Sequence, residues 1–142
     1  MIDLWPDDIG TVVVRSPAGI LREQASLLGE KTQHLVEAEV EPWMEMAPPG
    51  FFVYAFRLVA PTLGHYRYKL FTIAHDVVLY PVEFSVDSDI QAEISPSQRE
   101  LGAPDEGAFL EILEKILGSQ KTRRVVQALL TQAEPATDGI PF

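Results

Sequence analysis

The alternation of apolar and polar positions changes its period along the chain and so divides it into elements. Between residues 17 and 30, apolar side chains recur every three or four positions, which is the spacing of an amphipathic helix: Ile20, Leu21, Ala25 and Leu28. Ser16 and Pro17 precede this stretch, and a serine cap followed by proline in the first turn is a typical helix start. We therefore predict a first helix over residues 17–30.

The period then falls to two, as expected of a strand with one buried face. In residues 35–42, small apolar side chains occupy one face and three glutamates the other: Glu37, Glu39 and Glu41. Residues 51–60, 65–75 and 77–86 are further strand candidates, and the Pro-Thr-Leu-Gly sequence at 61–64 suits a hairpin loop. A register with Ala60 opposite His65 gives a four-stranded antiparallel meander.

The last third of the chain returns to a helical pattern. Residues 87–107 are polar and acidic and are predicted to form a connection, with a helical turn around residues 97–101. Two amphipathic helices follow, one ending near Gly118 and one ending before Glu134. The order predicts an α+β fold in which a helix is followed by a four-stranded antiparallel meander, with two C-terminal helices packed on one face of the sheet. We assign residues 1–134 to this single domain and 135–142 to a short tail, and leave open whether residues 11–14 add a strand.

Composition narrows the possible functions. The chain has 142 residues, which suits one domain, and no cysteine, which excludes a disulfide scaffold, a thiol nucleophile and an iron–sulfur cluster. Its 21 acids against 11 lysines and arginines give a net charge of −10, which argues against nucleic-acid binding. The N-terminus is acidic and lacks the apolar region of a signal peptide, and no apolar run approaches the ~20 residues of a membrane span. We expect a cytoplasmic protein that does not enter the membrane.

The predicted strand over residues 65–75 carries four basic residues at odd-numbered positions: His65, Arg67, Lys69 and His75. On a continuous strand they would point to one face and could form an anion- or ligand-binding surface. The alternative is that this face is simply the solvated side of the sheet. The chain has no G-x-S-x-G or phosphate-binding glycine motif, so we predict no catalytic residue and no cofactor.

The row of Glu37, Glu39 and Glu41 could hold a hard cation or supply a glycosidase carboxylate pair, although a solvated strand face is the simpler interpretation. No spaced metal motif accompanies the row, and we predict no metal site.

The loop over residues 43–50 combines Trp43, Met44 and Met46, which are residue types enriched at binding surfaces. We predict that these three residues contact a partner. The alternative is that the loop folds back and closes one end of the sheet's core.

Small size, acidity and mixed α/β content are similar to those of bacterial secretion chaperones and toxin-immunity proteins, a similarity of class that covers no motif. The first hypothesis is a non-catalytic protein-binding module: an inhibitor, a dedicated chaperone or an accessory subunit. Its partner would be a protein, with a basic surface as the electrostatic match. The alternatives are a small-molecule binder or enzyme using the basic face of the hairpin, and a self-assembling protein that forms a homodimer.

Overall fold

The computed structural model describes residues 1–12, 14–97 and 101–133, and it has the predicted α+β class. The elements follow in this order: α1 (Pro17–Lys31), β1 (Glu37–Pro42), the 3₁₀ helix η1 (Met44–Met46), β2 (Phe51–Ala60), β3 (Tyr66–Asp76), β4 (Val82–Val86), α2 (Ser88–Ile94), β5 (Leu101–Ala103), α3 (Glu106–Leu117) and α4 (Gln120–Ala133). The helix predicted over residues 17–30 and the two central strands therefore form nearly as expected.

The sheet has five antiparallel strands in chain order, β1-β2-β3-β4-β5, so the prediction of four strands is wrong by one. The extra strand, β5, is three residues long and lies in the segment predicted to be a connection. The short helix α2 occupies the same segment, where the Asp87 carboxylate accepts a hydrogen bond from the Ile90 N–H at 2.9 Å. Elements of this length are too short to display a hydrophobic period.

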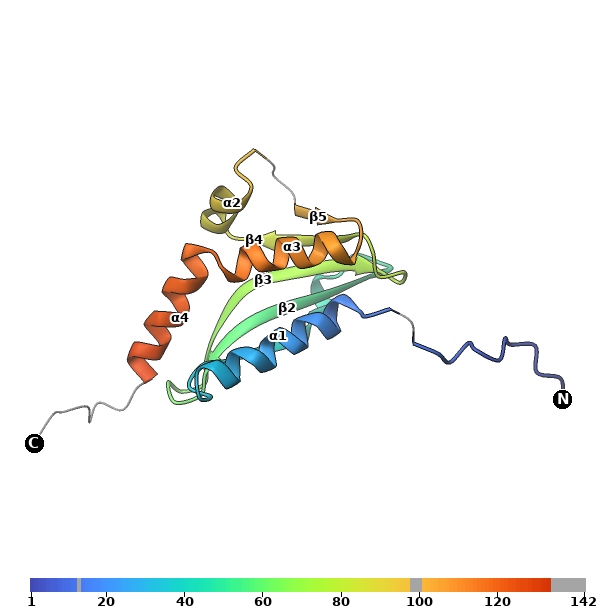
Figure 1. Ribbon diagram of the computed structural model, residues 1–142, viewed down its shortest axis with the longest axis horizontal. Helices are drawn as coiled ribbons and strands as arrows, with labels where there is room; N and C mark the ends of the chain where they lie inside the picture. The colour runs from blue at the N-terminus through green and yellow to red at the C-terminus, as the bar shows by residue number, and fades with distance from the viewer. Residues whose placement is uncertain (13, 98–100, 134–142) are drawn as a thin grey trace, which may run out of the picture.

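The helices lie on one face of the sheet, which we call the inner face (Figure 1). One core cluster joins side chains of α1, the sheet, α3 and α4. Aromatic rings fill its centre: Phe56 stacks on Phe71 with ring centroids 5.0 Å apart, and Phe84 stacks on Phe109 at 5.1 Å. The outer face carries alternate residues of the same strands, among them Glu39, Glu41, Arg57, Arg67 and Lys69.

A β-bulge in β3 changes which side chains reach each face. Phe56 pairs with Phe71 and Arg57 with Lys69, which leaves Leu70 without a partner in β2. Leu70 and Phe71 are both buried in the core although they are consecutive in the chain. The pairing predicted from the sequence is also wrong at the turn, where Ala60 lies opposite Tyr66 rather than His65 because His65 belongs to the turn. The bulge shifts the register by one further residue beyond Arg57.

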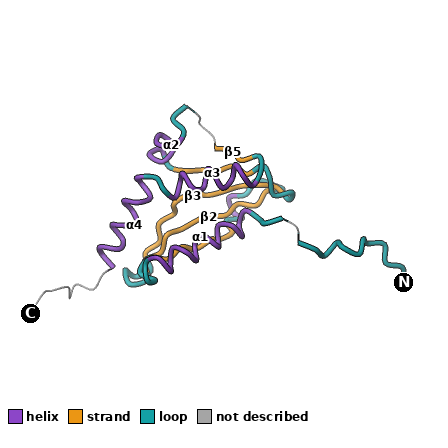
Figure 2. Tube along the Cα trace, in the orientation of Figure 1, coloured by secondary structure: helices purple, strands orange, loops and turns teal. Residues whose placement is uncertain are grey.

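Outside the sheet and helices, residues 1–12 form an extended arm that points away from the body (Figure 2). Thr11, Val12 and Val14 belong to no strand, and Val13 lies outside the described residues, as do residues 98–100 of the predicted helical turn and the predicted tail over 135–142. Residues 77–81, predicted to begin a strand, instead connect β3 to β4.

Candidate functional site

The four basic residues predicted to share one face do not gather there. Arg67 and Lys69 lie on the outer face, where Arg67 Nε is 3.3 Å from Glu39 Oε1. His65 lies in the β2–β3 turn with a φ of 56° and is exposed. His75 is only 4% exposed and stacks between Phe52 and Tyr54, with ring centroids 5.8 and 5.9 Å away.

The bulge at Leu70 separates His75 from Arg67 and Lys69, because odd-numbered residues before the bulge point to the outer face and odd-numbered residues after it point to the inner face. His75 Nδ1 lies 2.7 Å from the carbonyl oxygen of Asp76, the next residue in the chain. Because a carbonyl oxygen can only accept a hydrogen bond, Nδ1 is the donor and carries the proton. The expectation of one shared face is therefore wrong for His75, and of the four only Arg67 and Lys69 remain together.

Trp43 is part of the folded sheet rather than of a free loop. The backbone N–H of Trp43 donates a hydrogen bond to the Val53 carbonyl at 2.7 Å. The indole ring lies on the outer face, beside Lys69 and Arg57. Lys69 Nζ is 4.5 Å from the ring centroid and the Arg57 guanidinium carbon 5.7 Å, both within the range of cation–π attraction. Trp43 therefore packs on the outer face of the sheet, whereas Met44 and Met46 of the same loop are exposed.

Replacing Trp43 by alanine is expected to lower the free energy of unfolding by about 1–3 kcal/mol, because it removes the ring's burial and both cation–π contacts. Met44→Ala, in the same loop but exposed, should change it by less than about 0.5 kcal/mol. Urea denaturation of both variants measures the difference. Equal effects at the two positions would contradict the structural role of Trp43.

Large apolar side chains are exposed at one end of the sheet. At this end the chain connects β1 to β2 and β3 to β4. Six of them are exposed by 37% to 75%: Met44, Met46, Phe51, Phe52, Val77 and Val78. Strand pairing brings them together, since Phe51 and Phe52 lie opposite Asp76 and His75, the last residues before Val77. The η1 loop, which carries Met44 and Met46, leads into Phe51 through a turn in which the Phe51 N–H donates to Pro48 O at 3.0 Å. We call these six residues the apolar end.

The N-terminal arm adds exposed apolar side chains, and it leaves the body on the same side of Figure 1 as the β3–β4 connection. After Met1, its large apolar residues are exposed by 62% to 88%: Ile2, Leu4, Trp5, Ile9 and Val12. The sequence shows these residues, but they have no helical or strand period from which their exposure could be predicted.

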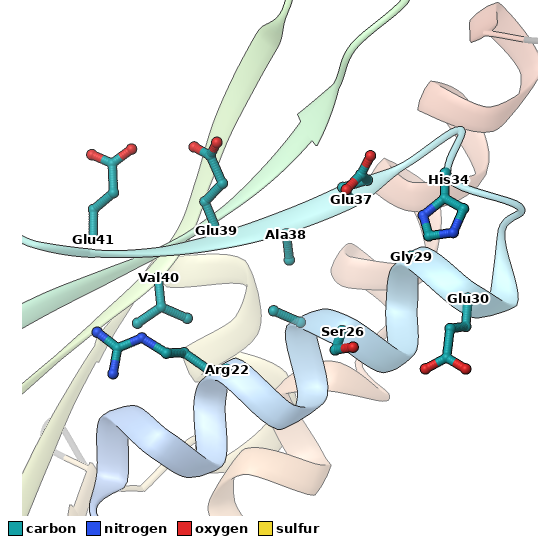
Figure 3. Close-up of a pocket in the computed structure, with 11 residues that line it drawn as sticks. Arg22, Ser26, Gly29, Glu30, His34, Glu37, Ala38, Glu39, Val40 and Glu41 are labelled. Atoms are coloured by element: carbon teal, nitrogen blue, oxygen red, sulfur yellow. The ribbon is translucent and has the colours of Figure 1, made fainter.

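A groove of about 610 Å³ lies between α1 and β1. In Figure 3, Ala38 and Val40 point toward α1, whereas Glu39 and Glu41 point away from it. Glu41 Oε2 pairs with Arg57 of the neighbouring strand β2 at 3.0 Å, and Glu39 pairs with Arg67 of β3, one strand further on. Two of the three glutamates in the row therefore form ion pairs with other strands. No cluster of three or more potential metal ligands occurs within residues 1–12, 14–97 and 101–133.

Polar contacts connect the start of α4 to α2. Lys121 Nζ lies 3.0 Å from Asp89 and 3.4 Å from Asp87, and hydrogen bonds to these two carboxylates raise the pKa of Lys121. The Gln120 N–H donates to the Glu93 carboxylate at 2.9 Å. These contacts attach α4 to α2.

The groups capable of acid–base chemistry are dispersed. Within the described part of the chain, no histidine ring is hydrogen-bonded to a hydroxyl or carboxylate side chain. The Tyr80 hydroxyl is buried without a hydrogen-bond partner there, and burial, followed by the charge of Glu106, raises the pKa of this phenol. A lone phenol with no adjacent base or nucleophile does not make a catalytic constellation.

Comparisons with protein-family models, with curated proteins and with solved structures found no match. The helices in the described ranges are all too short or too polar to cross a lipid bilayer.

Proposed function

We propose that this chain is a non-catalytic protein-binding module and that its contact surface is the apolar end. The observation that carries the proposal is the gathering of six exposed large apolar side chains from two loops and the adjoining strand ends. Soluble domains rarely leave contiguous apolar surface without a use, and methionine and phenylalanine are typical of the centre of an interface. An inhibitor, a dedicated chaperone or an accessory subunit would each use such a surface.

The charge around this surface defines the chemistry of the partner. Glu45 lies between the two exposed methionines, and Asp76 directly precedes Val77. With the protein's net charge of −10, these carboxylates favour a partner that has an apolar centre and a basic rim. Met44 and Met46, expected from the sequence to contact a partner, retain that role in the proposal, whereas Trp43 supports the surface from the sheet.

The test is a pull-down from the native host with tagged protein, followed by interferometry with the recovered partner. The double variant Met46→Ser, Val78→Ser is expected to weaken partner binding at least about tenfold, since both side chains lose their apolar contact. Leu110→Ser is the control, because Leu110 is an exposed apolar residue that lies on α3, outside the apolar end. A partner that binds the double variant as tightly as the unmodified protein would contradict the assignment of the surface, and so would an equal loss of binding with Leu110→Ser.

A ligand site built from His65, Arg67, Lys69 and His75 has less support. Arg67 and Lys69 are occupied by Glu39 and Trp43, and His75 faces the other side of the sheet. We therefore do not propose the basic face of the hairpin as a site for small molecules.

A further inference from the structure

A second cavity, on the inner face of the sheet, has a different chemistry from the surfaces above. It has a volume of about 460 Å³ and lies between α1 and α4, which diverge across β2 and β3 in Figure 1. Its floor is formed by buried side chains of the sheet, and half-buried side chains of the helices form its walls: Phe56, Leu58 and Leu70 below, and Leu28, Val126 and Leu130 at the sides. The volume is within the range of about 300–1,000 Å³ that is typical of small-molecule sites.

The charged residues that line this cavity, among those the structure describes, are both positive. Although the chain has 21 acids and 11 lysines and arginines, no aspartate or glutamate of the described residues lines the cavity, whereas Lys31 and Arg123 do. Lys31 is the last residue of α1 and Arg123 lies in the first turn of α4, so each helical wall supplies one cation. Neither has an ion-pair partner among the described residues. The groove between α1 and β1, in contrast, is lined by four glutamates.

We propose that this cavity binds a free long-chain carboxylate. The aliphatic chain would lie on the phenylalanine and leucine floor, where it leaves water, and the carboxylate would pair with Lys31 or Arg123 at the walls. Charge complementarity selects this occupant: a cationic amphiphile would be repelled by both walls, and a neutral one would leave both cations without a counter-ion. The site is separate from the apolar end, and the inference does not depend on the function proposed above.

Isothermal titration of the full-length protein with decanoate, dodecanoate and tetradecanoate, each below its micelle concentration, tests the proposal. We expect one carboxylate per chain, with affinity rising by about fourfold for each added methylene until the chain fills the cavity. Dodecyltrimethylammonium, which has the same chain and the opposite charge, should bind at least about tenfold more weakly than dodecanoate.

Variants locate the site. Lys31→Gln combined with Arg123→Gln should weaken dodecanoate binding at least about tenfold, and Arg124→Gln should leave it unchanged. Arg124 is a matched control because it is the next residue of α4, is exposed and does not line the cavity. Val126→Phe should weaken dodecanoate binding by narrowing the cavity, with circular dichroism and melting temperature showing that the protein stays folded.

Three results would overturn the proposal. The first is an absence of saturable dodecanoate binding, or binding of the cationic amphiphile that is equally strong. The second is an Arg124→Gln variant that loses as much affinity as the double variant. The third is a homodimer, measured by light scattering, that Val126→Phe dissociates, since a second copy of the chain would then be the occupant of the cavity.

Discussion

Replacing Phe109 by alanine is expected to lower the free energy of unfolding by about 3–5 kcal/mol. Phe109 is 0% exposed and is the aromatic side chain by which α3 enters the core. Its ring stacks on Phe84 at 5.1 Å and meets the edge of the Tyr80 ring at 6.2 Å. Alanine would remove these contacts and leave a cavity that the sheet cannot close, because the neighbouring rings are held by their own packing.

The neighbouring residue supplies the control for this prediction. Leu110 is 37% exposed, so Leu110→Ala should cost less than about 1 kcal/mol. Guanidinium denaturation followed by circular dichroism gives both values. If the two variants were equally destabilised, α3 would not pack through the face that carries Phe109.

The second large effect concerns Thr32, a buried hydroxyl where α1 ends and the chain turns toward β1. Its Oγ1 donates to the Val36 carbonyl at 2.7 Å and accepts from the Val36 N–H at 3.2 Å. Thr32→Val keeps the shape but removes the hydroxyl, which leaves both backbone groups of Val36 without this partner in a buried site. We expect a loss of about 1–3 kcal/mol in the free energy of unfolding.

Thr32→Ser is the matched variant, because it retains the hydroxyl and loses only a methyl group. It should therefore be more stable than Thr32→Val in urea denaturation, although its side chain is smaller. The reverse order would show that the methyl group, rather than the hydrogen bonds to Val36, makes Thr32 important.

Long elements with a clear period could be predicted from the sequence. In α1 the apolar residues Ile20, Leu21 and Ala25 recur at helical spacing and are buried in the core. In β1 the glutamates alternate with apolar residues, and the apolar residues face the core. The α+β class follows from the grouping of such elements along the chain. Tertiary packing did not override these local signals.

Three features could not be predicted in this way. The strand β5 is three residues long and depends on pairing with β4, which no local pattern records. The bulge at Leu70 depends on the fit of two strands to one core, and it moved His75 to the inner face. Val77 and Val78 have strand propensity, but the β3–β4 turn exposes them.

The candidate site likewise has some features that could be predicted from the sequence and others that could not. The composition of the 43–50 loop identified residue types suited to binding, and Met44 and Met46 are indeed exposed. The position of Trp43 depends on Lys69 and Arg57, which are distant in sequence, so its stacking on the sheet could not be predicted from the loop. The cavity between α1 and α4 likewise joins residues nearly a hundred positions apart.

The chain-order arrangement of the sheet has a consequence for synthesis on the ribosome. Neighbouring strands pair locally, so β1, β2 and β3 can form hairpins as soon as they emerge. Of the helices that cover their inner face, with Phe71 and Ile73, only α1 precedes these strands, and α3 with Phe109 is made later. The 36 residues from Ile73 to Phe109 take roughly 2–7 s to translate. The nascent chain is therefore most prone to aggregation during this interval, and slower translation between β3 and α3 lengthens the exposure.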